Sequence, residues 1–85
     1  IPFGSLVELG IIKPGTSIFD SKKKINAKIM VDGSIKYQQT EGSIHKVAAH
    51  IIGAESCNGW TFWHYNINGS IFPIDNLRQK LISKN

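Results

Sequence analysis

Apolar and polar positions follow spacings along the chain that predict short helices and strands. Residues 3–10 predict one or two turns of helix, because Ser5 could cap them through its Ser-x-x-Glu spacing and Gly10 could end them. Residues 17–19 predict a short strand after a Pro-Gly turn. The chain therefore opens with a small helix that leads into a sheet.

A hairpin is the next predicted feature. Residues 25–31 alternate between apolar and polar side chains, as a half-buried strand does. Asp32-Gly33 is a strong turn signal, and residues 34–37 predict the returning strand. The polar residues 38–42 that follow predict a loop.

The central apolar stretch predicts a helix over residues 43–53. Ser43 is suited to cap it, and Gly53 is suited to end it. The apolar side chains recur at the i, i+3, i+4, i+7, i+8 spacing of one buried face, which comprises Ile44, Val47, Ala48, Ile51 and Ile52.

Both tryptophans lie in residues 60–65, a stretch rich in aromatic residues that predicts a strand after a tight turn at residues 57–59. Successive side chains of a strand point to opposite faces, so Trp60 and Trp63 would lie on opposite faces. One face would fill the core, and the other would be open for stacking on a ligand. The pattern leaves the inward face undecided, and the alternative is that both rings are partly buried structural aromatics.

A last helix, from Asp75 to about Ile82, completes an α+β domain with a small antiparallel sheet and about three short helices. Eighty-five residues make a single domain, residues 1–85. No apolar run approaches the roughly 20 residues that span a bilayer, so we expect no membrane partner. Because the chain begins with Ile1, we expect it to be a piece of a longer protein.

The net positive charge of the chain favours an anionic partner. Ten Lys and Arg against six Asp and Glu give a net charge of +4, which favours nucleic acid, although a solvated basic face is the alternative. Lys22, Lys23 and Lys24 form a charge run in a predicted loop. Such runs are more often solvated than bound, and here they could add non-specific attraction to DNA.

Metal, nucleotide and covalent chemistry have weak support. The pattern argues against a zinc site, because no Cys-x-x-Cys or His-x-x-x-His pair occurs among His45, His50, Cys57 and His64. Cys57 and His45 could form a nucleophile and base, but no motif orients them, and a lone cysteine excludes an internal disulfide. The chain also lacks a Walker A or Gly-x-Gly-x-x-Gly sequence.

The start of the central helix is a better candidate site. Residues 42–45 would place free backbone N–H groups and the positive end of the helix dipole beside the Ser43 hydroxyl, an arrangement that suits a phosphate. Lys46 stands in the same first turn, where an acidic residue is the usual choice. A bound anion would explain the lysine, and the alternative is that Ser43 only caps the helix and Lys46 is only a surface residue.

The stretch GSIHKVAAHIIGAESCNGWTFWHY, followed by PIDNLR, resembles the C-terminal domain of the cell-cycle-regulated bacterial DNA adenine methyltransferases that modify GANTC sites, a module also called the RAMA domain. The resemblance includes KPGT at residues 13–16 and VDGSI at residues 31–35, and so covers nearly the whole chain. It implies a parent enzyme, solitary or part of a restriction-modification system, that transfers a methyl group from S-adenosylmethionine to adenine in duplex DNA. The family's catalytic Asp-Pro-Pro-Tyr and Phe-x-Gly-x-Gly motifs are absent from this chain, so we expect neither a cofactor nor catalysis in this domain.

The resemblance implies an accessory DNA-binding domain in which Ser43 and Trp60 occupy the family's DNA-binding positions. We expect His45, Lys46 and Asn58 to lie beside them and the lysines of residues 22–24 to assist. The expected partners are duplex DNA, the parent's own catalytic domain and a second copy of the parent, in the bacterial cytoplasm at the nucleoid. The alternative is a protein-interaction module whose aromatic face docks on the catalytic domain or on another subunit.

Overall fold

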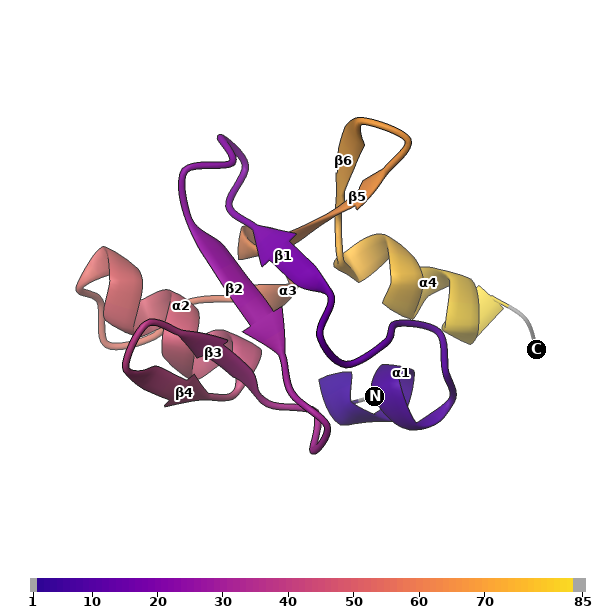
Figure 1. The fold of residues 1–85 in the computed structure, drawn as a ribbon, viewed down its shortest axis with the longest axis horizontal. Helices are drawn as coiled ribbons and strands as arrows, with labels where there is room; N and C mark the ends of the chain where they lie inside the picture. The colour runs from indigo at the N-terminus through magenta and orange to yellow at the C-terminus, as the bar shows by residue number, and fades with distance from the viewer. Residues whose placement is uncertain (1, 84–85) are drawn as a thin grey trace.

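The computed structural model describes residues 2–83, and in these residues a six-stranded antiparallel sheet packs with four helices (Figure 1). The helices are α1 (Phe3–Glu8), α2 (Ile44–Ile52), α3 (Gly59–Phe62) and α4 (Asp75–Ser83). The strands are β1 (Ser17–Phe19), β2 (Asn26–Ile29), β3 (Ile35–Tyr37), β4 (Thr40–Gly42), β5 (His64–Ile67) and β6 (Ser70–Pro73), in the spatial order β4-β3-β2-β1-β5-β6. The α+β prediction with an antiparallel sheet is confirmed.

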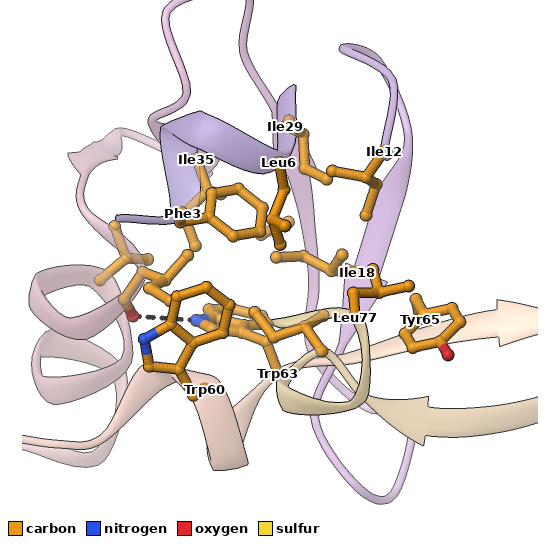
Figure 2. Close-up of a cluster of buried hydrophobic side chains, with 14 of the residues drawn as sticks. Phe3, Leu6, Ile12, Ile18, Ile29, Ile35, Trp60, Trp63, Tyr65 and Leu77 are labelled. Atoms are coloured by element: carbon orange, nitrogen blue, oxygen red, sulfur yellow. Dashed lines mark hydrogen bonds between the residues drawn. The ribbon is translucent and has the colours of Figure 1, made fainter. Parts of the chain in front are cut away.

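A single apolar core joins the sheet to the helices (Figure 2). Alternation in β2 and its neighbours points Ile18, Ala27, Ile29 and Ile35 into this core, where each is at most 1% exposed. The residues between them in β2 and β3 are exposed on the opposite face of the sheet. The alternation of residues 25–31 predicted the burial of Ala27 and Ile29 correctly, but β2 ends at Ile29, and Val31, expected on the same face, is 84% exposed.

The α2 helix begins and ends as predicted. The Ser43 hydroxyl accepts the backbone N–H of Lys46, and Gly53 ends the helix with a left-handed φ of 70°. Ile44, Val47 and Ala48 are buried, but Ile52 is 53% exposed, so the buried stripe is shorter than predicted. The last turn of α2 extends beyond the core.

The strand prediction for residues 60–65 is wrong in its first half. The Asn58 side chain accepts the backbone N–H of Trp60 and starts the helical turn α3, and only the residues from His64 onward form a strand. Residues three apart on a helical turn share a side, so Trp60 and Trp63 both turn into the core, at 5% and 0% exposure. The extra turn also explains why there are four helices instead of about three.

Two smaller expectations also fail. Residues 38–42 were expected to be a loop, but Gln38 adopts a φ of 54°, and the chain turns within two residues into β4. Ser5 lies inside α1 and does not cap it, because the helix already starts at Phe3 after the extended Pro2. Neither departure alters the core. None of the helices in residues 2–83 is long and apolar enough to cross a membrane.

Candidate nucleic-acid interface

The first turn of α2 combines an N-cap with a positively charged side chain. Ser43 Oγ accepts the Lys46 N–H at 3.0 Å, and the Ser43 carbonyl accepts the Val47 N–H at 3.0 Å. The first N–H groups of a helix have no acceptor within it, so those of Ile44 and His45 are left for other partners. No acidic residue stands in this turn, and the positive end of the helix dipole is therefore not neutralised from within α2.

A close junction between α2 and α3 holds this turn in place. Nδ1 of His45 accepts the Gly59 N–H at 2.9 Å, and the Trp63 indole N–H donates to the Ile44 carbonyl at 3.0 Å (Figure 2). The backbones approach so closely that a Cβ at Gly59 would lie 2.6 Å from the Ile44 carbonyl carbon. The two short helices are thus joined by hydrogen bonds and by a contact that leaves no room for a larger residue.

This junction also orients the polar groups of the site. Because Nδ1 of His45 accepts a hydrogen bond, the neutral ring carries its proton on Nε2, and that N–H is free to donate to a ligand. The aliphatic part of Lys46 lies against Gly42, since a Cβ at Gly42 would be 3.1 Å from Lys46 Cδ. The lysine side chain is therefore folded back toward the beginning of its own helix.

Two hollows flank the start of α2. One, of about 240 Å³, is lined by Ser43, Ile44, His45 and Trp60 together with Gly33 and the beginning of α1. The other, of about 450 Å³, is lined by Ser43, His45 and Lys46, by His50 one turn later, and by residues 54–57. Glu55 is the acidic member of the second lining. Ser43 and His45 contribute to both hollows, which makes the first turn of α2 a ridge that a ligand could contact from either side.

Trp60 is 5% exposed, so of the alternatives that the sequence left open, the structure has the one in which both tryptophan rings are buried. Its ring packs edge-to-face against Phe3, with ring centroids 6.0 Å apart, and the Arg78 guanidinium lies 4.6 Å from its centroid. Arg78 is held in turn by an ion pair with Asp75. Stacking of a base on Trp60 would require these neighbours to move, although Trp60 contributes to the lining of the smaller hollow.

The other predicted residues are placed in two different regions. Asn58 is exposed beside Gly59, but its side-chain oxygen is engaged by the Trp60 N–H. Lys22, Lys23 and Lys24 lie in the β1–β2 turn, before β2 begins, whereas Gly33 of the smaller hollow lies after β2 ends. The lysine run and the start of α2 are therefore associated with opposite ends of β2 (Figure 1).

Residues 2–83 contain no group of three His, Cys, Asp or Glu side chains placed to hold a metal ion. Cys57 is a free, half-buried thiol. It shares the larger hollow with His45, but no hydrogen bond joins the two in the described residues, and the Nδ1 atom of His45 is already engaged by Gly59. The geometry does not form a nucleophile and base.

A comparison with known families matches residues 1–85 to the model described as "Restriction Enzyme Adenine Methylase Associated", or RAMA. The chain belongs to the RAMA family. The family's name associates this domain with restriction enzymes and adenine methylases.

The RAMA domain is also similar to the Type II methyltransferase M.HinfI of Haemophilus influenzae. The two are 27% identical over 78 residues, which make up 92% of this chain and 22% of that enzyme. The chain thus spans about a fifth of the length of this relative.

Sequence reasoning missed one residue of the RAMA domain's site region. Arg78, in α4, covers the Trp60 ring although the two are 18 positions apart. Arg78 forms an ion pair with Asp75 three residues earlier in α4, and nothing in the sequence indicated its contact with an indole. Only the packing of α4 near α3 brings Arg78 to this position.

Proposed function

We propose that this RAMA domain binds duplex DNA on behalf of a larger adenine methyltransferase and that it holds a backbone phosphate at the start of α2. The observation that carries the proposal is the first turn of α2, where Ser43, His45 and Lys46 combine a helix N-terminus with a cation and no acid. The family's association with restriction enzymes and adenine methylases supports a DNA partner.

The proposed contacts follow from the donors available. A phosphate oxygen could accept the free N–H of His45 and the Nε2–H of its ring, while the Lys46 ammonium supplies the full positive charge. The helix dipole adds the equivalent of about half a charge at the same point. Such contacts fix the position of DNA without reading its sequence.

The chemistry is assigned to the rest of the parent. In this proposal a separate catalytic domain binds S-adenosylmethionine, extrudes the adenine and reads the GANTC-like site. The RAMA domain needs no cofactor of its own, and it acts in the bacterial cytoplasm, where the nucleoid lies. The lysines of residues 22–24 add non-specific attraction.

In this proposal Trp60 supports the site and does not stack on a base. Its buried ring supports α3 and, through Gly59 and His45, the orientation of the α2 start. The protein-docking alternative relied on an exposed aromatic face. Trp60 and Trp63 are both buried, so neither ring supplies such a face.

A pair of substitutions at Ser43 separates phosphate binding from helix capping. Asp and Asn both serve as good N-caps, so Ser43→Asp and Ser43→Asn should preserve α2 and the melting temperature. Only the Asp variant places a negative charge at the proposed phosphate. We expect Ser43→Asp to weaken binding to a fluorescent DNA duplex by roughly tenfold or more, whereas Ser43→Asn remains close to the wild type.

Wild-type binding should also weaken several-fold between low and moderate salt, because phosphate contacts release counterions. Equal affinities of the Asp and Asn variants, with both folded by circular dichroism, would refute the phosphate site at Ser43. Absence of any binding by the wild-type chain at low salt would refute the DNA-binding function itself.

A further inference from the structure

The outer face of the sheet carries a second basic surface, on the side away from the core. Because Ile29 and Ile35 point into the core, their neighbours Lys28 and Lys36 point to the open face. The register pairs these two lysines directly, Lys28 of β2 opposite Lys36 of β3. Two lysine side chains thus start from directly opposite positions on one exposed surface.

This pairing is unfavourable for the isolated domain. Like charges directly opposite each other on neighbouring strands destabilise a sheet. Glu41 faces Lys36 from β4, but its carboxylate lies 3.4 Å from the Ser34 hydroxyl instead. In residues 2–83 the one ion pair joins Arg78 to Asp75, so neither lysine forms an ion pair, although Glu41 opposite Lys36 offsets part of the repulsion. Lys28 faces Ser17 and Lys36 in the register and has no acidic partner there.

The lysine pair borders a hollow that is equipped to hold an anion. The hollow measures about 470 Å³ and has no acidic residue in its lining, which consists of Ser17, Asn26, Lys28, Met30, Lys36 and Gln38. Serine and amide side chains can donate hydrogen bonds to phosphate oxygens beside the two charges. At the adjacent end of β1, Lys23 lies over the Phe19 ring at 5.6 Å, which extends the basic surface toward the β1–β2 turn.

We propose that this open sheet face, centred on Lys28 and Lys36, is a second contact surface for the phosphodiester backbone of duplex DNA. The inference rests on the proposed DNA-binding function and adds a site on the face opposite the core. Bound phosphates would relieve the repulsion between the two lysines. The lysine run of residues 22–24 then has a role, as the continuation of this surface and not of the α2 site.

The test uses two double variants of the 85-residue chain with the same change in net charge. Lys28→Gln with Lys36→Gln removes the proposed contacts, and Lys13→Gln with Lys80→Gln removes two exposed lysines outside both surfaces. Affinity for a fluorescent duplex is measured over a range of salt concentrations. We expect the first variant to lose roughly ten- to sixtyfold in affinity at about 0.1 M salt and to flatten the plot of log affinity against log salt by about two units. The control variant should lose much less.

Thermal stability gives an independent measurement. Without DNA, Lys28→Gln should raise Tm by about 1–4 °C at low salt, because it removes the repulsion and leaves Lys36 opposite Glu41. The rise should disappear at about 1 M salt, where the charges are screened. A merely structural lysine would show a loss of stability instead.

The outcomes separate this inference from the function on which it rests. If the wild-type chain binds DNA and Ser43→Asp weakens binding, but the two lysine double variants bind equally well, the sheet-face inference is overturned and the α2 site stands. The sheet-face inference would also be overturned if the Lys28 and Lys36 substitutions weakened binding to poly-glutamate but left the affinity for DNA unchanged. Failure of the wild-type chain to bind DNA would remove both proposals.

Discussion

Replacing Gly59 with alanine tests how tightly the α2 and α3 helices are joined. An added Cβ would lie 2.6 Å from both the carbonyl carbon and the oxygen of Ile44, and 2.8 Å from its side chain. Favourable carbon contacts lie at about 3.5–4.0 Å, so the backbones must separate by close to 1 Å. Overpacking of this kind costs about 1–3 kcal/mol, which corresponds to a fall in Tm of about 4–20 °C for a domain of this size.

The separation would also stretch the two hydrogen bonds of the junction, from Gly59 to His45 and from Trp63 to Ile44. We therefore expect Gly59→Ala to weaken DNA binding along with stability. Thermal unfolding followed by circular dichroism measures the stability change, and the fluorescence titration described above measures the binding change.

A matched control for this substitution is Gly4→Ala in α1. A Cβ at Gly4 would meet its nearest atom, the Cα of Gly33, at an ordinary 3.9 Å. The alanine should therefore stabilise the fold by about 0.4–1 kcal/mol, because it restricts the unfolded chain. If Gly59→Ala melts at or above the wild-type temperature, the close α2–α3 contact is incorrect.

Three further predictions concern other single contacts. Trp63→Phe removes the indole donor to the buried Ile44 carbonyl and should cost about 1–2 kcal/mol, seen as a lower urea midpoint, and an unchanged midpoint would contradict it. Gly53→Ala meets no atom within 4 Å but forces alanine into a φ of 70°, so it should cost roughly 1 kcal/mol by the same assay; a neutral result would argue against the left-handed end of α2. Hydrogen bonds from the Ser34 hydroxyl and N–H hold the pKa of Asp32 below its ordinary value of 3.8. These hydrogen bonds therefore stabilise the fold above pH 3.8, and their contribution is lost as the pH falls through the lowered pKa. Ser34→Ala should raise the Asp32 pKa in an NMR titration, and an unchanged titration would contradict the hydroxyl contact.

The features that the sequence predicted well are those decided by neighbouring residues. Ser43 caps α2 because its hydroxyl reaches an N–H only three residues away, and Gly53 ends the helix because of its own backbone freedom. The alternation of residues 25–31 identified Ala27 and Ile29 as core because one face of a strand repeats every second residue. These choices need no information from distant parts of the chain.

The tertiary structure decided the features in which packing overrides a local preference or which depend on contacts between distant residues. Aromatic residues favour strands, but the Asn58 cap and packing against Phe3 made residues 59–62 helical and buried Trp60. The hydrogen bond between Gly59 and His45 joins residues 14 positions apart, and no local pattern predicts it.

The charged surfaces depend on the fold in the same way. The pairing of Lys28 with Lys36 follows from the register of two strands. The sequence gives the number of charges, but only the register shows which of them lie close together. The sequence by itself therefore determined the basic character of the chain, the start of α2 and the resemblance to a family. Only the folded chain decided which aromatic rings are buried and where the positive charges gather, because burial and charge proximity are properties of residues brought together from separate elements.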